Sequence, residues 1–284
     1  MDEIFIQSEE QRAILESVRR YVEEEVTPRA AELDAETDPE AAFSWEIVEA
    51  ADRMGLRTMS LSEELGGMGI DSTTTAMVVE ELARGDLGIS VVFAQTLKIA
   101  AIMEKAFNDD QIQRSLVPFV EDPRAVLSIC ITEPDSGSNG VLPHSTPLKT
   151  RAEKVDGGWL ANGMKHFISN SNRSRFFMVF MQTDPSKPMT EGVSCFLLER
   201  GHPGFTVGRV HDKMGERLAN NSELFFTDCF IPDENLVGEP NQAMKTLGAF
   251  MPSSNAYAAA SILGVAVALY EKSLDWAQTR IQGG

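Results

Sequence analysis

Apolar residues recur at helical spacing from the N-terminus to Val120. Leu15, Val18 and Val22 mark one face of a first helix, and the stretch from Ser8 to Gln11 has the spacing of a capping box at its start. The same periodicity predicts further helices over residues 44–54, 72–85, 90–107 and 109–120. A glycine-rich stretch at 63–69 is interpreted as a helix connector, with a ligand contact as the alternative.

After Asp122-Pro123 the pattern changes to short runs rich in Val, Ile, Phe and Thr, which are typical of strands. Asp156-Gly157-Gly158 predicts a hairpin between two of them. A helical pattern returns beyond Gly238, with an alanine-rich stretch from about Tyr257 to Ile281. The expected strands cover residues 126–131, 148–155, 159–168, 176–183, 193–199, 205–210 and 223–231.

Helices, strands and helices therefore follow one another as three blocks, which indicates an α+β multidomain protein rather than an alternating βαβ chain. The expected domains are a helical domain at 1–122, a β domain at 123–238 and a helical segment at 239–284. The last block is too short to bury itself alone. We expect it to be the first part of a larger helical domain that is truncated in this sequence.

Charge and composition exclude several classes of partner. With 43 acidic against 25 basic residues, the formal net charge of −18 argues against binding to nucleic acid or to an anionic membrane surface. No contiguous run approaches the roughly 18 apolar residues of a membrane span, and the N-terminus lacks the pattern of a signal peptide. We therefore expect a cytoplasmic protein without membrane contact.

Cysteine and histidine give no indication of a metal site. Cys130, Cys195 and Cys229 are isolated thiols in apolar runs, and the sequence has no CxxC or Cys/His cluster of the zinc type. Scattered thiols of this kind fit a reducing compartment. Four histidines, which lie in unrelated stretches, are interpreted as surface or strand residues rather than metal ligands: His144, His166, His202 and His211.

The stretch Ile131–Gly140, ITEPDSGSNG, follows the buried-strand pattern VLSICI. Its proline, aspartate, serines and glycines are ordinary turn residues. They also suit a backbone that approaches a ligand, because glycine permits close contact and hydroxyls donate and accept hydrogen bonds. Residue chemistry alone leaves both interpretations open.

Five stretches in the same order and structural context resemble the acyl-CoA dehydrogenase family. Residues 132–138 resemble its TEP-x-x-GS signature, and residues 163–170 resemble its G-x-K-x-W-I-T/S-N strand. The likeness covers the whole chain, although each stretch alone is weak. The other three are the glycine-rich loop at 63–69 ahead of Glu80-Glu81-Leu82, the stretch from Lys213 to Gly238, and residues 280–283.

This resemblance implies three domains: N-terminal helices, a middle antiparallel β-barrel or sandwich, and a C-terminal four-helix bundle. It also implies FAD as cofactor, an acyl-CoA substrate and α,β-dehydrogenation. A carboxylate would take the α-proton, the β-hydride would go to flavin N5, and an electron-transfer flavoprotein would accept the electrons. The implied assembly is a homo-oligomer, either a tetramer or a dimer.

By resemblance, the strand end from Ile129 to Ser138 lies along the flavin, and a second flavin wall comes from the later strand. Ser138 would meet both the cofactor and the CoA pantetheine, while Asn255 would lie at the substrate. Arg280 and Gln282 would reach the FAD of a neighbouring subunit. The complete set of implied cofactor residues is Ile129, Ile131, Thr132, Gly137, Ser138, Phe167, Ile168, Ser169, Arg280 and Gln282.

The chain departs from the family pattern at several positions. Phe167 replaces the usual tryptophan, and Asn139 replaces an aspartate. Asn255 stands where relatives often carry an arginine, and Ser254 stands where some place the catalytic glutamate. A serine cannot act as this base unaided.

The base is therefore expected beyond Gly284, where other relatives carry it. Glu133, beside Pro134, is interpreted as a brace for its turn, and Glu216 as a loop residue. Three hypotheses follow: an acyl-CoA dehydrogenase, a flavoenzyme of the same fold with oxidase, monooxygenase or elimination chemistry, and a non-catalytic binding fragment.

Overall fold

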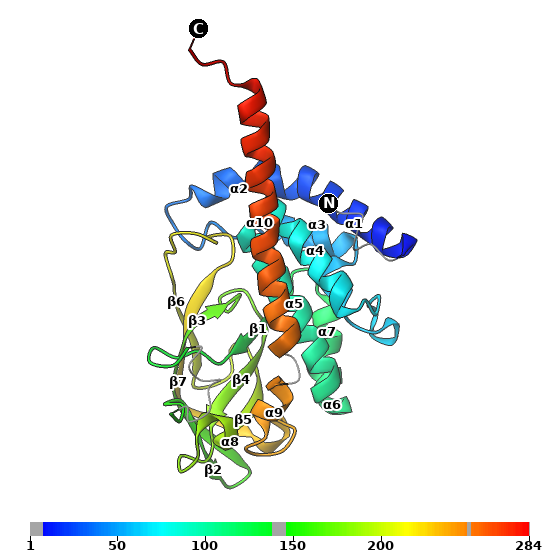
Figure 1. Cartoon of the computed structure of the whole chain (residues 1–284). Helices are drawn as coiled ribbons and strands as arrows, with labels where there is room; N and C mark the ends of the chain where they lie inside the picture. The colour runs from blue at the N-terminus through cyan, green and yellow to red at the C-terminus, as the bar shows by residue number, and fades with distance from the viewer. Residues whose placement is uncertain (1–7, 138–145, 249–250, 284) are drawn as a thin grey trace.

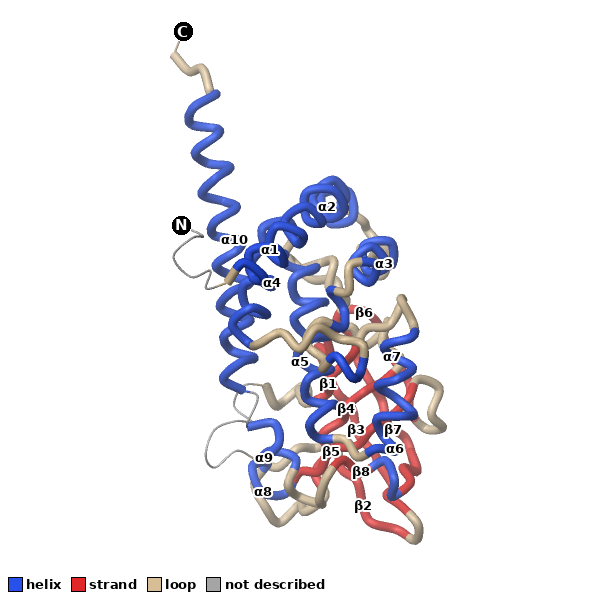
Figure 2. Tube along the Cα trace, turned by 90° about the vertical axis from the view of Figure 1, so that its right-hand side faces the viewer, coloured by secondary structure: helices blue, strands red, loops and turns tan. Residues whose placement is uncertain are grey.

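The computed structural model describes residues 8–137, 146–248 and 251–283. An N-terminal group of helices lies against a β-sheet, and one long C-terminal helix runs along the helical side (Figure 1). Figure 2, turned by 90°, shows the strands gathered at one end of the molecule, with α6 and α7 beside them, and α1 to α4 at the other end. The expected order of helices, strands and helices is confirmed.

Local capping explains where the N-terminal helices begin. Ser8, Ser44 and Asp71 each accept a hydrogen bond from the backbone N–H three residues later, which satisfies an otherwise unpaired donor. Between residues 63 and 69 the chain forms a 3₁₀ turn, as expected of a connector. The elements are α1 (Glu9–Tyr21), the π-helical turn η2 (Val22–Val26), α2 (Thr27–Asp34), α3 (Trp45–Arg53), the 3₁₀ turns η3 (Leu56–Thr58) and η4 (Glu63–Leu65), α4 (Ser72–Gly85), α5 (Leu87–Ala106), α6 (Asp109–Gln111), the π-helical turn η5 (Ile112–Leu116) and α7 (Val117–Glu121).

The middle domain is a β domain, as expected, but its sheet is open and mixed, so antiparallel barrel or sandwich describes it only loosely. Its strand order is β6-β7-β3-β2-β4-β5-β8, and β1 pairs in parallel with β4. The hairpin at Asp156–Gly158 is confirmed, because β2 and β3 are antiparallel neighbours. The strands are β1 (Leu127–Cys130), β2 (Arg151–Val155), β3 (Gly158–Ser169), β4 (Phe176–Gln182), β5 (Val193–Glu199), β6 (Phe205–Val210), β7 (Asn221–Pro232) and β8 (Leu236–Val237).

Both faces of the central strand β4 are buried, which explains its continuous apolar sequence. Phe176, Met178 and Phe180 point into a cluster shared with α5, while Phe177 and Val179 point into a second cluster on the opposite face. Helix α5 thus covers one face of the sheet. This packing places α5 beside the carboxyl end of β1, where the candidate site begins.

The long helix α10 runs back along the N-terminal helices, whereas α8 and α9 lie beside the sheet (Figure 1). Gly264 of α10 allows a close approach to α4, since a Cβ at this position would lie 2.1 Å from the backbone oxygen of Glu80. The alanine-rich stretch was expected to begin near Tyr257, but α10 begins six residues earlier, at Met251. The elements are α8 (Met189–Gly192), the 3₁₀ turn η7 (Asp233–Asn235), α9 (Ala243–Gly248) and α10 (Met251–Thr279).

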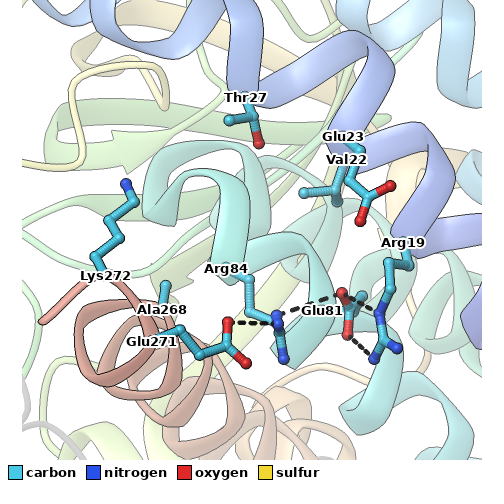
Figure 3. Close-up of a pocket in the computed structure, with 9 residues that line it drawn as sticks. All are labelled: Arg19, Val22, Glu23, Thr27, Glu81, Arg84, Ala268, Glu271 and Lys272. Carbon is cyan, nitrogen blue, oxygen red and sulfur yellow. Dashed lines mark hydrogen bonds and ion pairs between the residues drawn. The ribbon is translucent and has the colours of Figure 1, made fainter. Parts of the chain in front are cut away.

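Charged side chains also join α10 to α4 and α1. Figure 3 shows Arg84 between Glu81 and Glu271, with Nη2 at 2.6 Å from a Glu271 oxygen. Arg19 of α1 forms a second ion pair with Glu81 at 3.0 Å. These side chains line a surface pocket between α1, α4 and α10 (Figure 3). The Arg84–Glu271 ion pair links α10 to α4 there.

Among the described residues, α5 and α10 are long and apolar enough to cross a membrane by length and composition alone. The sequence analysis expected no such segment because it looked for runs of consecutive apolar residues. Mean hydropathy over a window also detects stretches in which polar residues interrupt the apolar ones. In α5 the apolar window is 67% buried, as in a core helix, and in α10 it is 17% buried. Such helices carry little weight for membrane insertion, because core helices share their length and composition.

Candidate functional site

The structure brings the end of β1 against β3. Ser128 Oγ donates a hydrogen bond to the Ser169 carbonyl at 2.8 Å, and the His166 N–H donates to the Thr132 carbonyl at 2.9 Å. Lys165 Nζ donates to the Ile131 carbonyl at 3.0 Å. Two segments that the sequence predicts at the flavin are therefore parts of one continuous wall.

A buried ion pair supports this wall from behind. Lys165 Nζ lies 2.8 Å from Glu133 Oε1, and the two side chains are 0% and 2% exposed. The carboxylate also accepts from the backbone N–H groups of Lys149 at 2.7 Å and Thr150 at 3.0 Å. The Glu133 carboxylate thus ties its turn to residues 149–150 and to Lys165, a structural role like the one that the sequence analysis gave it.

The electrostatics of this pair follow from its burial. Burial by itself would raise the pKa of Glu133, but the charge and hydrogen bond of Lys165 hold that pKa below its ordinary value. Burial lowers the pKa of Lys165, and Glu133 opposes this change. The carboxylate is thus kept ionised by its partners, which suits a structural role and not that of a general base.

Phe167 presents an aromatic ring at a break in the β3–β7 ladder. The register shifts between Lys165 and Ile168, and Phe167 adopts a φ of 56°. This left-handed conformation is uncommon for a bulky residue and turns the side chain out of the sheet. The residue is 54% exposed, and its ring lies tilted at 34° against His211 with centroids 4.5 Å apart.

His166 and His211, which the sequence analysis treated as unrelated, are neighbours with ring centroids 4.5 Å apart. Within the described residues, His166 Nδ1 and His211 Nε2 are buried and lack a hydrogen-bond partner. Burial, followed by the charge of His166, lowers the pKa of His211. Both unpartnered ring nitrogens lie beneath the surface beside Phe167.

Together with Glu223, these histidines have ligand atoms within 4.8 Å of one another, a spacing at which a metal ion could be held. The sequence analysis predicted no metal site. Arg209 Nε already lies 2.9 Å from the Glu223 carboxylate, and its positive charge opposes a cation at this place. The arrangement fits an ion pair beside an aromatic wall better than a metal centre.

Other predicted site residues differ in how they face the wall. Ile129 and Ile131 are partly buried against the α5 cluster. Ile168 is 2% exposed with its side chain in the sheet core, so only its backbone can meet a ligand. Gly137 is exposed, and a Cβ there would meet no atom within 4 Å. Ser138 lies outside the described residues.

Asn221 is a site residue that the sequence analysis missed. Its Nδ2 donates to Ser169 Oγ and to the Phe167 carbonyl, both at 3.1 Å. It thereby links the exposed bulge residue Phe167 to the partly buried Ser169. Only the shifted pairing of β3 with β7 brings it there, and no local motif marks it.

The predicted residues of α10 divide between its two ends. Asn255 is exposed near the start of the helix, and its neighbour Ser254 accepts a hydrogen bond from Lys98 Nζ at 3.1 Å. Arg280 and Gln282 follow the other end of α10, and the C-terminal end of the chain lies beyond the N-terminal helices, away from the sheet (Figure 1). The structure does not join them to the wall, so their proposed reach into another subunit stays a prediction.

The wall fits an isoalloxazine ring. Phe167, an exposed aromatic held at a strained bulge, gives a surface for ring stacking. The open space at Gly137 leaves room for a ligand beside the turn. The wall therefore has the features that the family resemblance predicts for one side of a flavin site.

Comparison with known proteins identifies the family. The acyl-CoA dehydrogenase N-terminal domain matches residues 8–122, and the acyl-CoA dehydrogenase middle domain matches residues 128–229. A short-chain specific acyl-CoA dehydrogenase of Clostridium acetobutylicum is 32% identical, with the match covering 97% of this chain and 70% of that protein. The chain belongs to the acyl-CoA dehydrogenase family, and it is a flavin oxidoreductase.

Solved structures agree with this assignment. The butyryl-CoA dehydrogenase of Megasphaera elsdenii has 29% identity and a TM-score of 0.87, with the match covering 100% of this chain and 72% of that one. The FAD complex of PigA has 27% identity and a TM-score of 0.87, with the same coverage. The cofactor is FAD, and the resemblance on which the site residues were predicted is confirmed.

Proposed function

We propose that this chain contributes the flavin and acyl-CoA contacts of an enzyme that dehydrogenates an acyl-CoA thioester between Cα and Cβ. The observation that carries the proposal is the hydrogen bond from His166 N–H to the Thr132 carbonyl, since it joins two predicted flavin-contacting segments. When bound, FAD supplies the acceptor for the hydride. The chain orients the ring through the backbone at Ile131 and Thr132, and excludes water from one ring face through Phe167.

The rest of the proposal follows from the family resemblance. A carboxylate base would come from sequence beyond Gly284, and an electron-transfer flavoprotein would accept the electrons in the cytoplasm. In a homo-oligomer, Arg280 and Gln282 would contact the FAD of a neighbouring subunit, with the guanidinium paired to the pyrophosphate.

The first experiment measures the intact mass of the natural protein under denaturing conditions together with any small molecule released. Released FAD, followed by bleaching of the flavin on addition of an acyl-CoA under anaerobic conditions, would support dehydrogenation. A natural chain of 31.2 kDa without flavin would contradict it and favour a binding module.

A flavoenzyme of the same fold with oxidase, monooxygenase or elimination chemistry is the second candidate. Ser254 and Asn255 favour it, because they stand where relatives carry a glutamate or an arginine, and because a lysine rather than a carboxylate contacts Ser254. Oxygen consumption and product mass distinguish the two: a dehydrogenase forms the enoyl-CoA and needs an electron acceptor other than oxygen.

Replacing Phe167 with alanine should weaken FAD binding by about tenfold, equivalent to about 1.4 kcal/mol, because the ring loses its stacking surface. Titration of the flavin-free protein with FAD, followed by flavin fluorescence, measures the dissociation constant. Phe230→Ala is the control, since Phe230 is also an exposed phenylalanine, at 44%, but lies on β7 away from the bulge. Equal effects of the two substitutions would contradict the role of Phe167.

A further inference from the structure

Among the described residues, Lys98 is a cation between two helices that lacks an acidic partner. It is partly buried on α5, and its Nζ donates to Ser254 Oγ on α10 at 3.1 Å. Within the described part of the chain no carboxylate forms an ion pair with it, whereas the buried Lys165 has Glu133. An amine desolvated in this way is costly unless an anion or another acceptor compensates it.

The surroundings of Lys98 agree with this description. Burial lowers the pKa of Lys98 to about 8, and no neighbouring carboxylate counteracts the change. At neutral pH the side chain therefore still carries a proton for most of the time. The hydroxyl of Ser254 accepts the hydrogen bond from Lys98 and keeps its own proton to donate. The pair thus offers two donors from one place.

The pair lies beside the elements that form the predicted flavin wall. Ile99, the next residue on α5, belongs to the apolar cluster against which Ile131 of the wall and Met251 of α10 also pack. Ser254 follows Met251 by one helical turn. An acyl chain bound between α5 and α10 would approach an ammonium and a hydroxyl.

We propose that Lys98 and Ser254 form an oxyanion-binding subsite that selects acyl-CoA thioesters whose acyl chain carries a carboxylate. A carboxylate has two acceptor oxygens, which match the ammonium of Lys98 and the hydroxyl of Ser254. A CoA phosphate is a poorer match, because it carries more charge than one cation balances and favours a solvated, multiply basic site. This inference rests on the proposed acyl-CoA function.

Calorimetric titration of the FAD-loaded, full-length protein tests the subsite without depending on turnover. The probes are ω-carboxyacyl-CoA thioesters of increasing length, each paired with the unsubstituted acyl-CoA of the same length. Wild type should bind the best carboxylated thioester at least about tenfold more tightly than its partner, as expected of a charge-assisted contact. Lys98→Met should remove most of that preference, and Ser254→Ala should reduce it by about threefold.

Lys105→Met is the matched control, because Lys105 is an exposed lysine on the same helix, and it should keep the wild-type preference. Urea unfolding should show Lys98→Met to be at least as stable as wild type, since the substitution removes a desolvated charge. A wild type without preference, or a Lys98→Met variant that retains it, overturns the subsite. So does a variant that weakens all CoA thioesters equally, because the amine would then contact the CoA moiety or act structurally.

Flavin bleaching in the same samples separates this inference from the proposed function. Bleaching by unsubstituted thioesters alone supports dehydrogenation and overturns the subsite. Preferential binding of carboxylated thioesters without bleaching by any thioester supports the subsite and contradicts dehydrogenation.

Discussion

Glu133→Gln should lower the free energy of unfolding by about 3–5 kcal/mol, because it leaves Lys165 as an uncompensated charge in the protein interior. The same change weakens the brace on the turn, since Glu133 accepts two backbone N–H groups as well as the lysine. Because the Ile131 carbonyl accepts from Lys165, FAD affinity should fall with stability. Urea unfolding and FAD titration measure the two effects.

Asp135→Asn provides the control for this prediction. Asp135 lies two residues further along the same turn and pairs with Lys149, but both side chains are exposed. Exposed pairs contribute little, so its effect should stay below about 1 kcal/mol. The double substitution Glu133→Gln with Lys165→Met should recover part of the loss, since no buried charge remains. Similar losses for Glu133→Gln and Asp135→Asn would refute the argument.

The pH dependence of the pair has a definite sign. The pKa of Glu133 is lower in the folded protein than its ordinary value. Its carboxylate therefore stabilises the folded protein at pH values above that ordinary pKa. That stabilisation is lost as the pH falls through the folded pKa. The Glu133→Gln variant should therefore lack this component of acid destabilisation.

Gly264→Ala should reduce stability by about 1–3 kcal/mol by forcing α10 away from α4. The added Cβ would lie 2.1 Å from the Glu80 carbonyl oxygen and 2.8 Å from Ala83 Cβ. A backbone oxygen inside a helix cannot rotate away as a flexible side chain can, so the helices must separate. Urea unfolding measures the loss, and hydrogen exchange over 251–279 should increase.

Gly248→Ala is the matched control for Gly264→Ala. An added Cβ at Gly248, the last residue of α9, meets no atom within 4 Å. Its stability should stay the same or rise slightly, because alanine favours a helix more than glycine does. If Gly264→Ala is equally harmless, the close packing of α10 on α4 is refuted.

Much of the fold was accessible from local sequence rules. Ser44 and Asp71 cap the helices that the periodicity predicted, because capping depends on residues within one turn. Gly157 adopts a positive φ in the predicted hairpin, where glycine has no Cβ to resist it. The expected barrel or sandwich described the open sheet only loosely, because strand order and closure depend on pairings between distant segments.

The predicted site shows the same division. Motif spacing alone, through the family resemblance, brought Thr132 and Phe167 into one site, and the hydrogen bond between neighbouring His166 and Thr132 joins their segments. The sequence analysis missed Asn221 and Lys98 as site residues and the pairing of His211 with His166, because their neighbours come from other strands and helices.

The sequence by itself thus determined the elements, their three-block order and the family, since these depend on short-range periodicity, capping and contiguous motifs. Only the tertiary structure decided that Glu133 forms an ion pair with Lys165 and that Lys98 donates its hydrogen bond to Ser254. The physical reason is that burial and charge compensation depend on which side chains meet in space. Two lysines of the same chemistry therefore differ in what they can bind.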